Sequence, residues 1–284
     1  MRIHAIQTGT VRVHQRQVRG SGSGPLRLVN TLLDRKWTDP LPIFAWLIEH
    51  PEGPIVVDTG ETAHGSAAGY YPPWHPYFRF GLKCSVEPEE EIGPQLGALG
   101  ISPDDVRWVV LTHLHTDHAG GLHHFPNAEI LVSRREYETA RGLTGQLRGF
   151  LSNRWPEWFT PTLIDFANGP YSPFRASHVL TDAGDVVLVP THGHTRGHLS
   201  VVLNTEVAVF FAGDASYTEQ LMLEEAVDGV STNVQSAGRT LRRIRQFVID
   251  RPAVYLPAHD PDAASRLAAR RLAVAAPEPA KAKA

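Results

Sequence analysis

The stretch LTHLHTDHAGGL, residues 111–122, places three histidines and one aspartate within six positions, from His113 to His118. It directly follows VRWVV (106–110), a nearly unbroken apolar run. Such a run is typical of a strand buried on both faces of a sheet. The glycines that follow the cluster, Gly120 and Gly121, permit a tight turn into a helix. The sequence therefore predicts a group of polar side chains where a loop leaves a buried strand.

The residue types in this cluster indicate a metal site. Imidazole and carboxylate groups are the ligands expected for zinc, iron, cobalt or manganese. His113, His115 and Asp117 alternate, so in extended backbone their side chains point to one side. His113 and His115 can chelate one ion, while Asp117 and His118 diverge toward a second. Two ions need further ligands, and later strand ends offer THGHTRGH (191–198), FAGDASY (211–217) and LPAHD (256–260).

Composition excludes several classes of protein. The 284 residues are 42% hydrophobic, which is enough for a substantial core. A net charge of −3 without a basic stripe argues against a nucleic-acid partner. No apolar run approaches the roughly 20 residues that span a bilayer. The N-terminus has no secretory signal, and the single cysteine, Cys84, excludes an intrachain disulfide. These features predict a soluble, cytoplasmic protein with neither a nucleic-acid nor a membrane partner.

The rest of the chain predicts strands that alternate with covering helices, and therefore an α/β layered fold. One amphipathic helix is expected near residues 231–250, and one helix at 134–141. Two stretches rich in aromatic residues, Pro and Gly, 62–83 and 149–174, are predicted to be long loops. We expect a single domain over residues 1–272 and a disordered tail over 273–284. The predicted strands are PIFAWLIEH (42–50), PIVVDTG (54–60), VRWVVLTH (106–113), AEILVS (128–133), DVVLVPTH (185–192), the hairpin SVVLNTEVAVFFAGD (200–214) and AVYLPAHD (253–260).

The order His-x-His-x-Asp-His, Gly-His-Thr-x-Gly-His, Gly-Asp and Pro-x-His resembles the motif series of the metallo-β-lactamase-fold hydrolases, over residues 56–260. The resemblance implies an αββα sandwich with a dinuclear metal site on one edge. Carried over by position, it implies that Asp58 supports the ligands without binding metal, and that His192 and His198 are not ligands. The implied ligands are His113, His115 and His194 for one ion, Asp117, His118 and His259 for the other, and Asp214 as the bridge.

Within this superfamily, GDASYTE (213–219) resembles the N-acyl-homoserine lactonases, whose tyrosine three residues after the bridging aspartate faces the substrate carbonyl. Tyr217 holds that position here. The resemblance implies a quorum-quenching lactonase with two divalent ions, zinc first among iron, cobalt and manganese, and with Asp117 and Tyr217 as catalytic residues. The alternatives are an organophosphate or phosphodiester hydrolase, an arylesterase, and a metal-binding protein without catalysis.

The implied substrate is a small lactone or ester, and an acyl chain needs an apolar trough beside the metals. Aromatic side chains of the two long loops could line this trough, or could pack beneath the loops or form a homodimer contact. These side chains are Tyr70, Tyr71, Trp74, Phe78 and Phe80 in the first loop, and Phe150, Trp155, Trp158 and Phe159 in the second.

Overall fold

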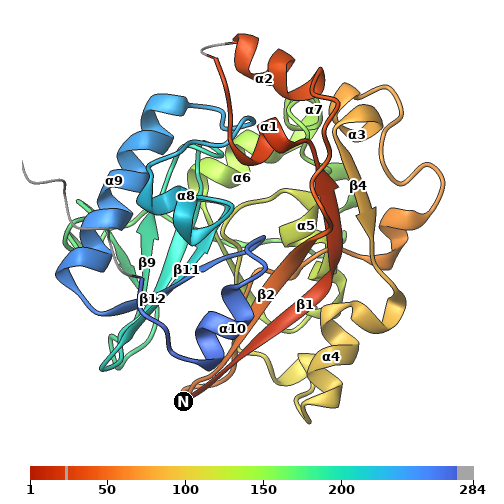
Figure 1. Ribbon diagram of the computed structural model, residues 1–284. Coiled ribbons are helices and arrows are strands. Elements are labelled where there is room, and N and C mark those ends of the chain that lie inside the picture. Colours follow the sequence, from red (N-terminus) through yellow and green to blue (C-terminus); the bar gives the residue numbers. More distant parts are fainter. Residues whose placement is uncertain (23–24, 274–284) are drawn as a thin grey trace, which may run out of the picture.

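Two β-sheets pack face to face in the computed structural model, which describes residues 1–22 and 25–273 (Figure 1). The first sheet has seven strands in the order β4-β1-β2-β3-β5-β6-β7, and the second has five in the order β12-β11-β10-β9-β8. The first sheet contains β1 (Arg2–Val13), β2 (Leu41–Glu49), β3 (Ile55–Val57), β4 (Leu82–Ser85), β5 (Trp108–Val110), β6 (Glu129–Ser133) and β7 (Thr162–Ile164). The second contains β8 (His178–Val179), β9 (Val186–Pro190), β10 (Leu199–Leu203), β11 (Ala208–Gly213) and β12 (Ala253–Pro257).

Apolar side chains from both sheets fill the space between them. Trp46 on β2 lies 5.8 Å from Phe211 on β11 between ring centroids, which joins the inner faces of the two sheets. Val110 on β5 belongs to this inner core, whereas its neighbour Val109 faces the helices outside. The strand is therefore apolar at every position because both of its faces are covered.

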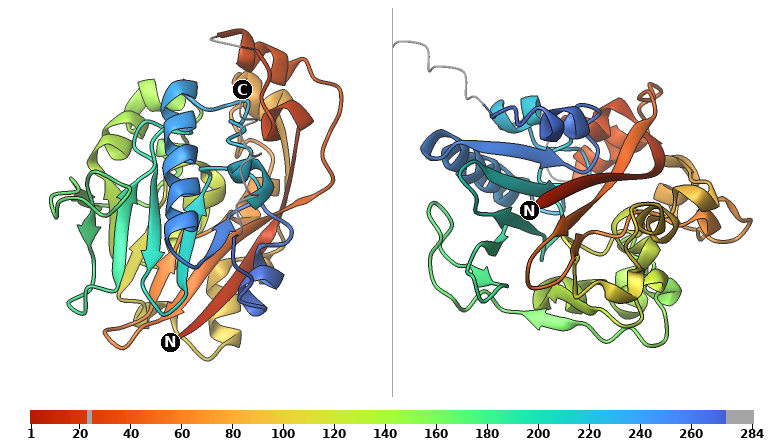
Figure 2. Two further views of the ribbon diagram at one scale, coloured as in Figure 1. Left: turned by 60° about the vertical axis from the view of Figure 1, so that its left-hand side comes forward. Right: turned by 90° about the horizontal axis from the view of Figure 1, so that it is seen from below.

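Helices cover the outer face of each sheet and complete the predicted αββα sandwich. Figure 2 shows α9 (Val234–Asp250) along the outer face of the five-stranded sheet. Asn233 begins this helix by accepting a hydrogen bond from Ser236 N at 2.8 Å. Its apolar side chains recur at helical spacing, and four of them pack on that sheet: Leu241, Ile244, Phe247 and Val248.

The remaining helices surround the first sheet and the edge of the sandwich. Among residues 1–22 and 25–273, no helix has the length and apolar character needed to cross a membrane. The remaining α-helices are α1 (Gln15–Val18), α2 (Pro25–Leu32), α3 (Pro76–Phe80), α4 (Ile92–Ala98), α5 (Thr116–Ala119), α6 (Arg134–Ala140), α7 (Gly142–Gln146), α8 (Glu219–Leu223) and α10 (Ala263–Ala268). Short 3₁₀ turns are η1 (Ala63–Ser66), η2 (Pro88–Glu90), η3 (Pro103–Asp105), η4 (Gly120–His124) and η5 (Ser152–Arg154).

The predicted strands and both predicted helices are confirmed, including the β10–β11 hairpin, in which Val201 pairs with Phe211. The sequence analysis missed β1, which pairs antiparallel with β2. The two predicted long loops also contain regular structure, since α3 lies in the first and β7 in the second. The single domain stays a prediction. Of the predicted tail, residues 274–284 lie outside the described residues, and Ala273 is buried.

Two backbone hydrogen bonds join the sheets at one edge of the sandwich. Leu199 N donates to Thr112 O at 2.9 Å, and Phe44 N donates to Ala258 O at 2.9 Å. Thr112 directly precedes His113, and Ala258 directly precedes His259. The predicted ligand loops are therefore fixed to both sheets, which limits how far they can move relative to one another.

Candidate metal centre

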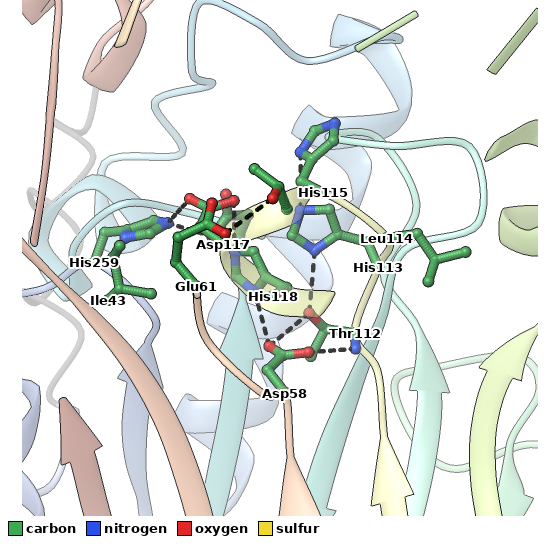
Figure 3. A network of polar contacts seen from close by, with 12 residues as sticks. Ile43, Asp58, Glu61, Thr112, His113, Leu114, His115, Asp117, His118 and His259 are labelled. Carbon is green, nitrogen blue, oxygen red and sulfur yellow. Dashed lines mark hydrogen bonds and ion pairs between the residues drawn. The ribbon is translucent and has the colours of Figure 1, made fainter. Parts of the chain in front are cut away.

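Four strand ends bring the predicted ligands to one edge of the sandwich. His113 follows β5, and His115 is the residue on which α5 begins, so the turn of α5 carries Asp117 and His118 (Figure 3). His194 follows β9, Asp214 comes directly after β11, and His259 follows β12. Because β3 runs parallel to β5, and β11 to β12, their carboxyl ends open onto the same edge.

Three histidine nitrogens converge on one point of this edge. His113 Nε2 lies 3.0 Å from His115 Nδ1, and His194 Nε2 lies 3.1 Å from the same atom. Burial lowers the pKa of His115 to about 3, and the neighbouring His194 contributes in the same sense. Burial also lowers the pKa of His113. Both imidazoles are therefore neutral at physiological pH and present lone pairs, which is the form that binds a metal ion.

A second group forms beside the first from Asp117, His118 and His259. His259 Nε2 lies 3.4 Å from Asp117 Oδ2, and His118 Nε2 lies 4.0 Å from Asp117 Oδ1. The turn of α5 places Asp117 and His118 beside His259, and the His118 ring also packs on His113 at 4.0 Å between centroids. The two groups together supply nitrogen and carboxylate ligands for two ions.

Asp214 lies between the two groups. Its Oδ2 is 3.4 Å from His194 Nε2 of the first group. Its Oδ1 is 3.3 Å from His118 Nε2 and 3.4 Å from His259 Nε2 of the second. Each carboxylate oxygen thus faces a different group, which is the arrangement that a bridging ligand requires.

The buried nitrogen and oxygen atoms at this site are of the kind that a metal ion binds. His118 Nε2 and Asp214 Oδ1 are buried and make no hydrogen bond within the described residues, although they lie 3.3 Å apart. Buried polar atoms without a hydrogen-bond partner are costly, and a metal ion held by both atoms would offset this cost. Burial alone would lower the pKa of His118, but the carboxylates of Asp214 and Asp58 reverse this and raise it. Metal binding there would release a proton.

Asp58 holds the second group from behind. Its Oδ2 accepts a hydrogen bond from His118 Nδ1 at 2.9 Å, which directs His118 Nε2 at the centre. Thr112 donates to the same carboxylate from its backbone nitrogen at 2.7 Å and from its hydroxyl at 2.8 Å. Asp58 has a backbone φ of 58°, in the left-handed region that few residues adopt. The His259 ring is fixed similarly, since its Nδ1 donates to Pro42 O at 2.9 Å.

His198 supports the centre without facing it. Its Nε2 accepts a hydrogen bond from Asp214 N at 3.0 Å, and its Nδ1 pairs with the Thr191 hydroxyl at 2.9 Å. Both ring nitrogens are therefore occupied. His192 is half-buried and its Nδ1 donates to His198 O at 3.1 Å. This geometry fits the expectation that His194 is the ligand of this loop.

Two acidic residues at the site were missed by the sequence analysis. Glu136 on α6 accepts hydrogen bonds from Leu114 N at 3.2 Å and from Gly197 N at 3.0 Å, so it contacts both histidine loops. Asp228 Oδ2 lies 3.6 Å from His194 Nδ1, behind the first group. Neither residue lies in a histidine motif, so no local signal in the sequence pointed to them.

A cavity of about 570 Å³ opens onto the centre. The predicted ligands on its floor are His115, Asp117, His194, Asp214 and His259. Tyr217 also lines it, with its ring stacked on His259 at 5.5 Å between centroids. Its walls are largely apolar side chains from β1, α2, α3, β4 and the end of α7, namely Val11, Val13, Leu28, Phe78, Leu82 and Leu147. A small molecule with an apolar tail fits such a space.

Comparison with known proteins now assigns the family, because the model of the metallo-beta-lactamase superfamily matches residues 38–259. The chain belongs to this superfamily. It is 31% identical to an N-acyl homoserine lactonase of Bacillus sp. over 224 residues, covering 78% of this chain and 82% of the relative. It is 28% identical to the N-acyl homoserine lactonase AttM of Agrobacterium fabrum over 276 residues, covering 93% and 94%.

Solved structures agree on the fold of this superfamily member. An N-acyl homoserine lactone hydrolase with the product N-hexanoyl-L-homoserine bound at its catalytic metal centre superposes with a TM-score of 0.72 at 24% identity, covering 92% of this chain and 93% of the other. A quorum-quenching N-acyl homoserine lactone hydrolase superposes with a TM-score of 0.70 at 25% identity, covering 92% of both chains. Superfamily membership and the donor set together indicate that the chain binds divalent metal ions.

The predicted aromatic trough is largely wrong for this metallo-beta-lactamase fold. Of the aromatic side chains proposed for it, all within the described residues, Phe78 alone lines the central cavity. Phe150 lies beneath His115, at 5.1 Å between centroids, and Trp155 and Phe159 pack on Tyr137. The alternative, packing under the long loops, describes these side chains. Besides α3, β4 and the end of α7, the walls include β1 and α2 of the N-terminal segment, and the position of β1 depends on its pairing with β2.

His123 and His124 lie outside the metal centre, in the turn η4. The Glu91 carboxylate pairs with both, at 3.0 Å from His123 Nε2 and 2.7 Å from His124 Nε2. Glu91 also accepts hydrogen bonds from the Thr62 hydroxyl and from Ala63 N. Glu91, His123 and His124 therefore hold η4 against the segment that follows β3.

Proposed function

We propose that this protein is a dinuclear metal-dependent hydrolase that opens the lactone ring of N-acyl-homoserine lactones. The observation that carries the proposal is Asp214, whose two carboxylate oxygens face two separate ligand groups beside the Tyr217 ring. The curated relatives named above are N-acyl homoserine lactonases, and the chain covers most of their length. The substrate is a small molecule, which the volume and apolar walls of the cavity can hold.

The proposed ligands follow from the two groups. We assign His113, His115 and His194 to one ion, and Asp117, His118 and His259 to the other, with Asp214 shared. We expect zinc, with iron, cobalt and manganese as ions that the same donors accept. When bound, such ions lower the pKa of water so that it can attack at neutral pH, and they polarise a carbonyl.

Tyr217 is proposed to bind the lactone carbonyl oxygen. Burial raises the pKa of Tyr217, so its hydroxyl keeps its proton and acts as a hydrogen-bond donor. A donor held in place before the reaction stabilises the negative charge that develops on the carbonyl oxygen when water adds to it. The stacking of Tyr217 on His259 keeps the ring beside the ligands.

Asp117 is proposed to carry a proton to the leaving oxygen. Its side chain reaches the cavity, and Oδ2 lies 3.4 Å from His259 Nε2. Water adds to the carbonyl carbon, the ring C–O bond breaks, and the proton that water loses passes through Asp117 to the departing alkoxide. The product is an N-acyl-homoserine with one hydroxyl group and one carboxyl group, and the carboxyl group ionises at neutral pH and releases the second proton of the water to solvent.

The test is proton release by purified, metal-loaded protein given short-chain and long-chain N-acyl-homoserine lactones. We expect rapid ring opening that a chelator abolishes and that His259→Ala removes, while His123→Ala, which lies outside the centre, behaves as wild type. Two bound ions without lactone hydrolysis would contradict the proposal, and phosphotriesters and aryl esters would then be compared. The predicted homodimer and the predicted cytoplasmic location stay predictions.

A further inference from the structure

One side-chain amide on the cavity wall holds two tyrosine hydroxyls. Gln17 Nε2 donates to the Tyr77 hydroxyl at 2.8 Å and to the Tyr217 hydroxyl at 2.9 Å. All three residues line the cavity above the metal centre. They come from α1, from α3 and from the loop after β11, so the contact joins segments that are far apart in the sequence.

The direction of these hydrogen bonds determines what the two phenols can do. A primary amide nitrogen carries two hydrogens, and here each is given to a different phenol oxygen. Each phenol therefore accepts from Gln17 and retains its own proton. Within the described residues, neither phenol donates that proton to a protein acceptor. The amide thus presents two adjacent O–H donors to the cavity.

The backbone around Gln17 is itself anchored. Gln17 is 2% exposed, its carbonyl accepts a hydrogen bond from Gly229 N at 2.7 Å, and its own N–H donates to His14 O at 2.8 Å. The nearby cation on the wall, Arg27, is occupied by backbone carbonyls, including that of Asp228 at 2.8 Å. The paired phenols are therefore fixed donors on a wall that is otherwise mostly apolar.

We propose that Tyr77 is a second substrate-binding residue, which donates to the amide carbonyl of the N-acyl group while Tyr217 donates to the ring carbonyl, and that Gln17 is the positioning residue for both. The inference rests on the proposed lactonase function. In an N-acyl-homoserine lactone, only the ring α-carbon and the amide nitrogen separate the two carbonyl carbons. Two donors held by one nitrogen atom match two acceptors that lie this close together.

The inference explains how the cavity would select an N-acyl lactone over a simple lactone. Tyr217 is adjacent to the ligand His259, so it faces the bond that breaks. Tyr77 is followed on α3 by Phe78, which with Leu82 forms part of the apolar wall. A substrate that lies across both hydroxyls would extend its acyl chain along that wall.

The first experiment compares two lactones on wild type and Tyr77→Phe. The substrates are N-hexanoyl-homoserine lactone and an α-alkyl-γ-butyrolactone of the same length, which has the ring but no amide. We expect Tyr77→Phe to lower kcat/KM for the N-acyl lactone by about tenfold, mainly through KM, since one hydrogen bond is lost. The alkyl lactone should change by less than about twofold. Tyr171→Phe is the matched control, because its hydroxyl pairs with Asn204 away from the cavity.

The second experiment tests the role of Gln17 through two substitutions with opposite polarity. Gln17→Leu removes the donor, and Gln17→Glu preserves the size but accepts from both phenols instead of donating to them. We expect both variants to lose kcat on both lactones, because the Tyr217 hydroxyl loses its position. We expect KM to rise through Tyr77 for the N-acyl lactone alone, because the alkyl lactone has no amide carbonyl for Tyr77 to bind. Thermal unfolding midpoints are measured in parallel, so that a loss of activity from misfolding is recognised.

The possible results distinguish an error in the roles of Tyr77 and Gln17 from an error in the proposed lactonase function. If wild type opens both lactones and Tyr77→Phe affects both equally, or neither, the role of Tyr77 is overturned while the lactonase function stands. Wild-type activity in Gln17→Glu would overturn the positioning role. If the metal-loaded wild type opens neither lactone, the proposed function fails, and this inference fails with it.

Discussion

The Glu136 carboxylate accepts a hydrogen bond from the Thr195 hydroxyl at 2.7 Å, although the two residues lie 59 positions apart. Thr195 directly follows the proposed ligand His194, and the other Glu136 oxygen accepts from Leu114 N, between His113 and His115. One buried carboxylate on α6 therefore sets the separation between the loops that carry the first ligand group. Such supporting contacts orient metal ligands and tune their affinity for the ion.

Removing this carboxylate should weaken metal binding. We expect Glu136→Ala to lower metal affinity by about 10–100-fold, which is typical of the loss of a residue that orients ligands. The measurement is competition against a chromophoric chelator. Glu138→Ala, on the exposed side of the same helix, is the control and should bind metal as wild type does. Equal affinities in the two variants would contradict the role assigned to Glu136.

Asp58 is predicted to govern the second ion. Asp58→Asn removes the charge that pairs with His118 Nδ1, while asparagine tolerates the φ of 58° at this position. We therefore expect a correctly folded protein that retains close to one ion per chain at metal concentrations where wild type holds two. Elemental analysis after dialysis, with circular dichroism to confirm the fold, gives the result. Full occupancy of both ions in Asp58→Asn would show that this contact is dispensable.

Tyr217→Phe is predicted to separate catalysis from metal binding. The substitution removes one hydroxyl oxygen and leaves the ring stacked on His259. We expect kcat for N-acyl-homoserine lactones to fall by about 100–1,000-fold, in the range seen when a donor to a developing oxyanion is lost. Metal content should stay at the wild-type level. Unchanged turnover would remove the catalytic role of this hydroxyl.

Metal removal should lower the stability of the fold as well as its activity. An ion that binds only the folded state adds about 4 kcal/mol to the free energy of unfolding when its concentration is 1,000 times its Kd. Chelation should therefore lower the unfolding temperature by several degrees, and zinc should restore it. Magnesium should not, because it prefers oxygen ligands to imidazole. Differential scanning calorimetry compares the chelated protein, the chelated protein with zinc added and the chelated protein with magnesium added. Equal unfolding midpoints in all three would count against a structural contribution of the ions.

The environment of Glu61 should make the free energy of unfolding of the metal-free protein depend on pH. Burial raises the pKa of Glu61 from 4.5 to about 8. Since the folded state holds this proton more tightly than the unfolded state, the stabilisation is complete below about pH 4.5 and is lost as pH rises to about 8. Glu61→Gln resembles the protonated form at every pH, so its advantage over wild type should grow in this window by up to about 1.4 kcal/mol per pH unit.

Urea unfolding of chelator-treated wild type and Glu61→Gln between pH 5 and 9 measures this difference. Glu138→Gln, at an exposed position, serves as the control and should follow the wild-type curve. If the free energies of unfolding of wild type and Glu61→Gln run parallel across the whole range, the carboxyl titrates at its ordinary pKa.

The α/β layered fold could be predicted from the sequence because it depends on local pattern, whereas the expected ligand groups came from the resemblance of the motif order to a known family. Continuous apolar runs indicated the buried strands, and the helical spacing of residues such as Leu241 and Ile244 indicated α9. The order of the motifs identified the expected ligands. The structure brings His113, His115 and His194 together, and all three belong to those motifs. Strand β1 was missed because a half-buried strand with mixed polarity gives a weak periodic signal.

Other features depend on contacts between distant segments, and only the tertiary structure decides them. Glu136 and Gln17 lie in short helices whose local sequence resembles a solvated surface, yet each meets partners from other parts of the fold. The predicted trough failed for the same reason. Among the described aromatic side chains proposed for it, Phe78 alone lines the cavity, and the N-terminal β1 and α2 supply part of the wall. The sequence alone determined which residues can bind metal, because ligand chemistry resides in the residue type and its place after a strand. The tertiary structure decided what orients those ligands and what shapes the cavity, because these follow from the packing of segments that no local pattern links.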